Sequence, residues 1–540
     1  MALLSILAAL LGLAITAAII RLILRRSSPT PASDRPRDLH HTHRRPVPRL
    51  GGLALVAAFA GLQLFTVIAG PAQQAVSPFR DVLILTSLAM FGLGFWDDLR
   101  PLGAKRKLLG QILIALVVCC SGLGIQVVRL PLTQHELALH GWGVLLTVLW
   151  LVGMTNLINL IDGADGLAGG ISLMLMLLLA YVGHQAGQFE LLAFGMAGAL
   201  LGFLWFNYPP ARVYLGDGGA YFLGFQIGFL SLVNSHKGEV FGALAGPMFV
   251  LALPILDTAL AVLRRGLWGL PVFRPDQRHL HHRLRQIGFS RRRVVLSFYA
   301  VTLVFLALGF AAVWSRGQWV PGLLGLGALV LLVCARSLSF TREWFHVGRV
   351  MGNLPEMRRE IQYALSLTRW LELEGGRQTS PELLWLDLIF AARKLGFTSA
   401  KLTLADGKRA WSAREEGGPT RSIRQELDGG RSGVLTLGAP RCAWKEASEG
   451  QAGPAGECTR RCPCISDANL FEVLSELLAE GLLKAVARWK NGEQVAVRFD
   501  AGSFMSQRSP GRPVAALLGA EAGPRPAGAN GLISEMASPR

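Results

Sequence analysis

The sequence predicts an all-α polytopic membrane protein that carries a small α+β domain near its C-terminal end. The 540-residue chain is 51% hydrophobic and only 17% charged, a composition typical of membrane proteins. Apolar segments of about 20 residues, the length that crosses a hydrocarbon core, recur along roughly the first three fifths of the chain. Beyond about residue 340 these segments stop and the composition becomes that of a water-soluble domain.

The apolar segments predict about eleven transmembrane helices. The first has no basic residue before it and no small-residue cleavage site after it, so we interpret it as an uncleaved span and not as a signal peptide. The expected limits are 2 to 24, 51 to 69, 80 to 96, 107 to 128, 141 to 160, 167 to 184, 189 to 206, 218 to 235, 240 to 263, 294 to 314 and 318 to 336.

Lysine and arginine are concentrated in alternate loops between these spans. The positive-inside rule then places the crowded loops in the cytoplasm, the N-terminus outside, and the C-terminal region inside. The net charge of +18 lies mostly beside the spans, so it predicts contact with anionic lipids and phosphorylated substrates, and no nucleic-acid partner. We therefore expect a multi-pass protein of the inner (plasma) membrane whose active site faces the cytoplasm.

Acidic and other polar side chains gather at the cytoplasmic ends of the predicted spans. Asp97 and Asp98 end the third span, and Lys107 follows in the next basic loop. Adjacent carboxylates near a lysine suit Mg²⁺-assisted phosphate chemistry, because hard oxygen ligands hold the ion and lysine neutralises phosphate. The alternative for an isolated Asp-Asp pair at a helix end is an ordinary polar cap.

A second polar block closes the fifth span. Asn156 and Asn159 lie three residues apart on one helix face and lead into a glycine-containing turn with Asp162 and Asp165. The two carboxylates of that turn can point at one site. A plain polar turn between two spans is the alternative, but it would not need two asparagines inside the preceding apolar run.

The third block places Asp217 between glycines at the start of the eighth span, where the backbone can approach an ion or a phosphate closely. A tight turn explains the same pattern. The fourth block, in the loop after the ninth span, contains Arg278, His279, His281 and His282. Zinc binding is one reading of the histidines, but the neighbouring arginines favour a phosphate or pyrophosphate ligand.

These blocks, in this order, resemble the polyprenyl-phosphate N-acetylhexosamine-1-phosphate transferase family (glycosyltransferase family 4 type) over roughly residues 1 to 336. The first cytoplasmic loop adds a match from His43 to Gly52. There His40 and His41 stand where the family has a basic pair, and Arg44 and Arg45 could supply the phosphate contact instead.

The resemblance implies roles for individual residues. Asp97 or Asp98 would deprotonate the lipid phosphate or help to hold the metal, and Lys107 would face the pyrophosphate. Asp217, Asp162 and Asn159 would bind Mg²⁺, with Mn²⁺ as the alternative ion. The substrate-binding residues would be Asn156, Asn159, Arg44, Arg45, Arg278, His279, His281 and His282.

The implied reaction is attack by the lipid phosphate on the β-phosphorus of a UDP-sugar, with release of UMP. The spacing of His279, His281 and His282 is closer to the transferases that use UDP-N-acetylglucosamine, with undecaprenyl phosphate as acceptor, than to the one that loads the muramyl-pentapeptide. Other classes remain open: an ion-coupled transporter, for which Asp257 is the one acid well inside a span, or a sensor that kept only the membrane fold. The chain could form a homodimer.

The chain beyond the spans divides into a helical juxtamembrane linker (337 to 379), a cytosolic α+β domain (380 to 500) and a disordered tail (501 to 540). Patterns predict a helix at 383 to 395, strands at 399 to 404 and 433 to 437, and a helix at 469 to 489, an order faintly like a GAF-type module. Cys442, Cys458, Cys462 and Cys464 could bind zinc or be free thiols.

Overall fold

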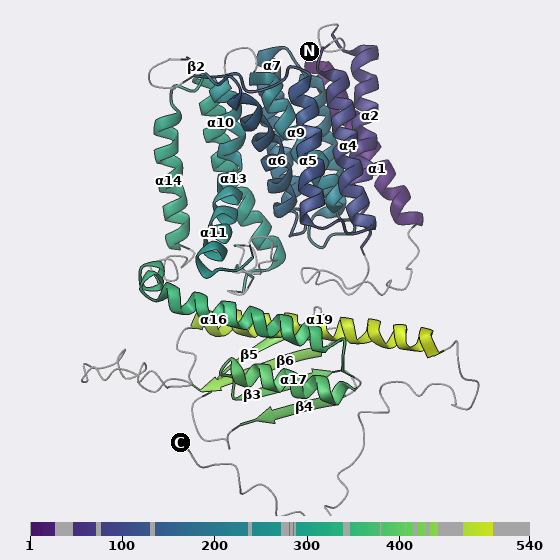
Figure 1. The fold of residues 1–540 in the computed structure, drawn as a ribbon. Coiled ribbons are helices and arrows are strands. Elements are labelled where there is room, and N and C mark those ends of the chain that lie inside the picture. Colours follow the sequence, from purple (N-terminus) through teal and green to yellow (C-terminus); the bar gives the residue numbers. More distant parts are fainter. Residues whose placement is uncertain are drawn as a thin grey trace, which may run out of the picture. The chain divides into compact units, whose positions relative to one another are not determined.

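In a computed structural model, the chain forms two units, which separate near Leu354 and which we describe one at a time (Figure 1). The structure describes residues 2–26, 47–71, 77–129, 136–235, 240–271, 280, 284–285, 288–337, 346–378, 380–404, 407–413, 420–427, 433–440 and 468–500. Arg44, Arg45, Arg278, His279, His281, His282, the four cysteines of the C-terminal region and the predicted tail at 501 to 540 lie outside these residues.

The first unit is a bundle of long helices that run side by side (Figure 1). Each predicted span coincides with one or more of them. They are α1 (Ala2–Arg26), α2 (Gly51–Ala69), α4 (Arg80–Leu99), α5 (Ala104–Cys120), α6 (Trp142–Ile161), α7 (Leu167–Ala186), α8 (Glu190–Asn207), α9 (Gly216–Ser235), α10 (Val240–Val250), α11 (Ala252–Trp268), α13 (Arg291–Trp314) and α14 (Val320–Ser337).

Seven of the described helices are long and apolar enough to cross a membrane, and an eighth crossing follows if one bent helix pair counts as a single span. The polytopic membrane fold is therefore confirmed, whereas the count of eleven stays a prediction. Tryptophans are exposed at both ends of the bundle: Trp96 and Trp205 at one end, Trp142 and Trp314 at the other. Such positions suit a membrane–water interface, where an indole ring finds both apolar and polar surroundings.

Two predicted spans differ from the structure. The span at 107 to 128 ends at Cys120, because Gly122 adopts a positive φ of 86° that stops the helix. A short antiparallel hairpin follows, with strands β1 (Val127–Arg129) and β2 (Glu136–Ala138). The span at 240 to 263 is broken at Leu251 into segments that meet at 73°. Pro254 explains the break, because its ring would clash with the carbonyl of Val250 in a continuous helix.

The tightest helix contact lies between α1 and α8 and is lined by glycines. A Cβ on Gly198 would overlap the carbonyl oxygen of Ala9, and a Cβ on Gly12 would overlap that of Gly195. Small residues at these positions let the two backbones touch, which is how helices associate in lipid where apolar burial gives little driving force. This contact attaches the N-terminal helix to the bundle.

The second unit begins within α16 (His346–Glu374) and contains α17 (Pro381–Lys394), four strands and α19 (Ala468–Asp500). The strands are β3 (Ser399–Leu404), β4 (Gly407–Ser412), β5 (Thr420–Leu427) and β6 (Gly433–Pro440), joined as an antiparallel sheet in the order β4-β3-β6-β5. Buried Leu388, Leu437 and Phe471 come from α17, the sheet and α19, so helices and sheet share one core.

Sequence patterns located β3 and the start of β6 but missed β4 and β5. The register explains why β4 was missed: Leu402 of β3 pairs with Arg409 of β4, whose guanidinium donates to Glu382 of α17 at 2.7 Å. A charged residue thus occupies a position that faces a helix, and the alternation of apolar and polar residues is lost. The likeness to a GAF module stays a prediction.

We predict that Gly198→Leu separates α1 from α8 and destabilises the detergent-solubilised protein by about 2 kcal/mol or more, since the added side chain has no space between the backbones. Thermal unfolding measures the effect. Gly153→Leu is the matched control, because a Cβ added to Gly153 on α6 would have nothing within 4 Å of it. Equal melting temperatures for the two variants would contradict the role of the glycine contact.

Candidate active site

Four helix connections meet at one end of the bundle. The α6–α7 and α8–α9 turns are joined because the Gly166 amide donates to Asn207 Oδ1 at 2.9 Å. The chain leading into α2 is joined to the α8–α9 turn because Tyr214 N donates to the Pro48 carbonyl at 2.9 Å. The α4–α5 turn reaches the same place through Lys107 and Asp217. Polar residues far apart in the sequence therefore converge at this end.

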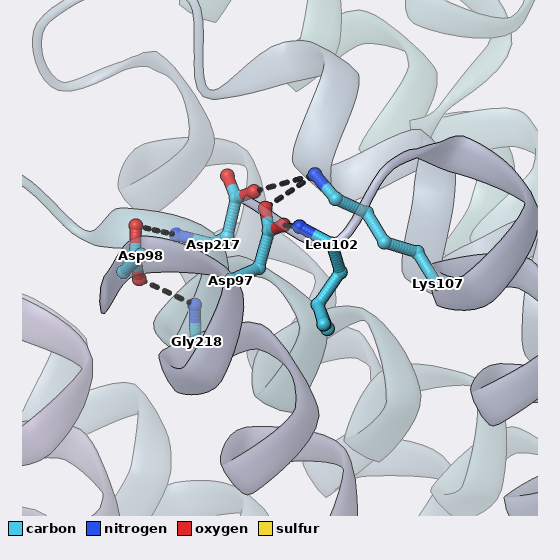
Figure 2. A network of polar contacts seen from close by, with 6 residues as sticks. All are labelled: Asp97, Asp98, Leu102, Lys107, Asp217 and Gly218. Carbon is cyan, nitrogen blue, oxygen red and sulfur yellow. Dashed lines mark hydrogen bonds and ion pairs between the residues drawn. The ribbon is translucent and has the colours of Figure 1, made fainter. Parts of the chain in front are cut away.

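Asp97, Lys107 and Asp217 form an ion-pair network at the centre of this end (Figure 2). The Lys107 ammonium contacts Asp97 Oδ2 and lies 3.3 Å from Asp217 Oδ2. Asp97 is also held by the Leu102 amide, which donates to its Oδ1 at 2.8 Å. One cation thus lies between two carboxylates that belong to different helices.

The network is open to solvent on one side. The Asp97 side chain is only 7% exposed, whereas those of Lys107 and Asp217 are 26% and 31% exposed. An anionic ligand can therefore reach the lysine and the second carboxylate without unfolding the bundle. We interpret this opening as the entrance to a site for a phosphorylated molecule.

Asp98 has a different role from its neighbour Asp97. Its two carboxylate oxygens accept the backbone amides of Asp217 and Gly218 at 3.1 and 3.0 Å (Figure 2). These amides belong to the first turn of α9, whose donors have no partner inside the helix. Asp98 therefore caps α9 across the chain and fixes where Asp217 stands, as a carboxylate at a helix N-terminus is expected to do.

Glycines allow α4 and α9 to come close enough for this cap. A Cβ on Gly94 would lie 2.5 Å from the Asp217 carbonyl oxygen, and one on Gly218 would lie 3.0 Å from the Phe95 nitrogen. Gly216 has a φ of 77°, and its Cβ would lie 2.8 Å from Asp98 Oδ2. A side chain at any of the three would push the helices or the cap apart.

Asp162 is the C-terminal cap residue of α6 and faces the same carboxylates. Burial, together with the negative charges of Asp217 and Asp98, raises the pKa of Asp162 well above its ordinary value. The shift shows that negative charge is in excess around Asp162. A cation at this place would relieve that excess.

The structure separates Asp165 from Asp162, although the sequence suggested that both carboxylates point at one site. Asp165 Oδ2 accepts the Ala211 amide at 3.2 Å and lies 3.8 Å from a guanidinium nitrogen of Arg291. Asp165 thus holds the α6–α7 turn against the α8–α9 turn and the start of α13. The expectation of two converging carboxylates in this turn was wrong, because the backbone amide of Ala211 takes the second one.

The two asparagines of α6 also differ in their surroundings. Asn156 Nδ2 donates to the buried Gln111 Oε1 of α5 at 2.6 Å and to the Val152 carbonyl at 2.8 Å. Asn159 lies nearer the turn, where its carbonyl accepts the Asp162 amide at 3.3 Å. The assignments of Asn156 to substrate and of Asn159 to substrate and metal stay predictions, and the contacts of Asn156 bind α5 to α6.

The structure also identifies contacts that the sequence patterns did not indicate. Asn207, buried at the end of α8, accepts the Gly166 amide and donates to the Val213 carbonyl at 2.7 Å. Tyr299 of α13 donates to the Gly166 carbonyl at 2.5 Å. Arg292 Nε donates to the Pro209 carbonyl at 3.0 Å. The partners are backbone groups, so spacing in the sequence gives no signal for them.

The donor set suits a hard divalent cation. All the converging acids offer carboxylate oxygens, the ligands that Mg²⁺ prefers, and Mg²⁺ in proteins is commonly held by one or two carboxylates plus water and substrate phosphates. Among the described residues, no group of three or more His, Cys, Asp or Glu side chains is close enough to hold a metal ion by itself. The pair Asp97 and Asp217, already arranged around one ammonium, is therefore the candidate for metal binding.

The loop that carries the predicted histidine block is attached near the site. Asp257 Oδ1 of α11 accepts the amide of Leu280, the buried residue between His279 and His281. An acid inside a span is a candidate ion carrier in a transporter. The contact of Asp257 with this loop gives it a local structural role instead.

Part of the chain that forms this site matches a known family. Residues 81–235, from α4 to α9, match the model of glycosyl transferase family 4. The chain is 34% identical over 279 residues to a Bacillus subtilis (strain 168) protein named probable undecaprenyl-phosphate N-acetylglucosaminyl 1-phosphate transferase, covering 50% of this chain and 76% of that protein.

Two further relatives carry related names. A decaprenyl-phosphate N-acetylglucosaminephosphotransferase of Mycobacterium leprae (strain TN) is 32% identical over 340 residues, which are 58% of this chain and 84% of the relative. A phospho-N-acetylmuramoyl-pentapeptide-transferase of Moorella thermoacetica (strain ATCC 39073 / JCM 9320) is 34% identical over 299 residues, which are 53% and 89%. The names agree on transfer of a phosphorylated amino sugar, but the sugars differ.

We predict that Tyr299→Phe loosens the α6–α7 turn, because it removes only the hydroxyl that donates to the Gly166 carbonyl. Loss of a hydrogen bond worth about 1 kcal/mol should speed amide hydrogen exchange in a peptide covering this turn by about fivefold. Tyr181→Phe is the matched control, since Tyr181 packs edge-on against Phe310. Unchanged exchange in Tyr299→Phe would show that the hydroxyl does not hold the turn.

Proposed function

Because the chain belongs to glycosyl transferase family 4 and, within it, to the polyprenyl-phosphate N-acetylhexosamine-1-phosphate transferases, we propose that it transfers N-acetylglucosamine 1-phosphate from UDP-N-acetylglucosamine to undecaprenyl phosphate and releases UMP. The observation that carries this proposal is the joint placement of Asp97, Lys107 and Asp217 at one solvent-open end of an apolar helix bundle. A lipid carrier can keep its chain in the membrane while its headgroup reaches such a site.

The proposed reaction joins two anions, so neutralising charge is the main task of the site. The phosphate oxygen of the carrier forms a bond to the β-phosphorus of the UDP-sugar, and the bond from that phosphorus to the UMP oxygen breaks. Lys107 is placed to neutralise phosphate oxygens at the opening. Asp97, which is buried beside Lys107, is the better candidate than Asp98 for accepting a proton, because Asp98 uses both oxygens to cap α9.

Mg²⁺, or Mn²⁺ in its place, would supply positive charge to the phosphate oxygens. Asp217, with Asp97 or Asp162, would hold it. Support comes from the charge balance among the described residues: the four carboxylates of Asp97, Asp98, Asp162 and Asp217 face the cations of Lys107 and Arg49. Negative charge therefore exceeds positive charge, which favours binding of a divalent cation.

We place this reaction at the cytoplasmic face of the inner membrane, as an early membrane step of cell-envelope polysaccharide synthesis. The basic loops at the site end of the bundle support that orientation through the positive-inside rule. The donor N-acetylglucosamine is preferred because two of the relatives described above name it, whereas one names the muramoyl-pentapeptide.

We predict that the purified protein in detergent, supplied with undecaprenyl phosphate, Mg²⁺ and UDP-N-acetylglucosamine, releases UMP. Asp217→Asn should lower the rate by about 100-fold or more, since the carboxylate charge is lost while the shape of the side chain is kept. Coupled detection of UMP measures it, with UDP-N-acetylmuramoyl-pentapeptide as the competing donor. Faster release from the pentapeptide donor would overturn the sugar assignment, and an Asp217→Asn protein as active as wild type would overturn the site.

Lys107→Gln should lower kcat/KM by about 100-fold or more, because the buried Asp97 loses its ion-pair partner and the phosphate loses a cation. Lys107→Arg keeps the charge and should retain a larger share of the activity. Steady-state kinetics of the two variants tests this expectation. Activity of Lys107→Gln within threefold of wild type would show that the ammonium does not act on the substrates.

A further inference from the structure

Arg49 lies at the edge of the site on a segment that is held in place on both sides. Before it, the Pro48 carbonyl accepts the Tyr214 amide at 2.9 Å; after it, the Gly51 and Gly52 amides donate to the carbonyls of Tyr214 and Leu215, also at 2.9 Å. This short backbone pairing lays Arg49 along the chain that leads into α9. Its position is therefore fixed by backbone contacts and not by its own side chain.

The backbone of Arg49 and the carboxylate of Asp98 meet at Gly216. A Cβ placed on Gly216 would lie 3.0 Å from the Arg49 carbonyl oxygen and 2.8 Å from Asp98 Oδ2. The start of α2 and the end of α4 thus approach the same glycine at the start of α9. Arg49 stands next to the residue that caps α9, on a helix start separate from the one that carries Lys107.

The charge of Arg49 acts on the acids of the site. It attracts the carboxylate of Asp98. Burial raises the pKa of Asp162, and Arg49 opposes that rise. The half-buried Arg49 side chain makes no ion pair within 4.0 Å that the structure records among the described residues, whereas Lys107 is shared between Asp97 and Asp217. Arg49 therefore contributes positive charge while its guanidinium donors stay available.

We propose that Arg49 binds a phosphate group of one of the two substrates, as a second cationic contact of the site beside Lys107. A guanidinium presents its donors as a planar fork that matches two phosphate oxygens, which an ammonium cannot do. The proposal rests on the proposed function, and it adds a substrate contact that no sequence pattern singled out. The phosphate comes either from the polyprenyl phosphate headgroup or from the UDP-sugar diphosphate.

The test compares the full-length Arg49→Gln, Arg49→Lys and Arg212→Gln proteins with wild type. Arg212→Gln is the matched control: it removes one cation from the same end of the bundle, but the Arg212 guanidinium lies 4.9 Å from the centre of the Phe206 ring and donates to the Trp205 carbonyl at 3.3 Å. Thermal unfolding and gel filtration establish that each variant is folded.

Each substrate is varied while the other is saturating, and binding of UDP is measured separately by calorimetry. We expect Arg49→Gln to raise the KM of one substrate by about 10-fold to 100-fold, and Arg49→Lys to recover part of the loss. A rise for undecaprenyl phosphate with unchanged UDP affinity assigns the lipid headgroup. A rise for the UDP-sugar with weaker UDP binding assigns the nucleotide.

KM values and UDP affinity of Arg49→Gln within twofold of wild type would overturn the proposal. Losses equal to those of Arg212→Gln would also overturn it, because they would reflect only the general positive charge of this end. If wild type releases UMP from neither donor, the proposed function fails. Arg49 is then judged by UDP binding alone, and unchanged affinity in Arg49→Gln rejects its role. If Arg49→Gln does not fold, Arg49→Lys decides by the same criteria.

Discussion

The close contact between α4 and α9 is the constraint on which the site depends. Gly94 and Gly218 let the two backbones touch, and Asp98 then reaches the first amides of α9. That cap fixes Asp217, and Asp217 completes the pair of carboxylates around Lys107. The ion-pair network is thus a consequence of helix packing, because a wider spacing would break the cap before it affected the lysine.

The acids at this end of the bundle divide into two groups that the sequence does not distinguish. Asp98 and Asp165 bind backbone amides and hold helices and turns together. Asp97 and Asp217 face a cation, and Asp162 lies in their field. A carboxylate satisfied by two amides has little capacity left for metal or proton transfer. The structure therefore narrows the choice between Asp97 and Asp98, which the Asp-Asp motif left open.

Hydropathy predicted where the helices lie, because each must present apolar residues to lipid or to neighbouring helices. It also predicted that the polar blocks share one end, since alternate turns of such a bundle lie on the same side. It could not predict the break at Leu251 or the end of α5 at Cys120, which depend on single proline and glycine residues. Nor could it predict the contacts of Asn207 and Tyr299, because their partners are carbonyl and amide groups that every residue has.

The start of α9 links the two cations of the site. Lys107 is bound to α9 through Asp217, and the Arg49 segment is bound to the chain just before α9 through Tyr214 and Leu215. A shift of α9 would therefore move both cations relative to the acids in the same event. Two anionic reactants must be held close together for phosphate to attack phosphate, and repulsion between them opposes this. A single rigid helix start that positions both cations resists that repulsion better than two side chains anchored independently.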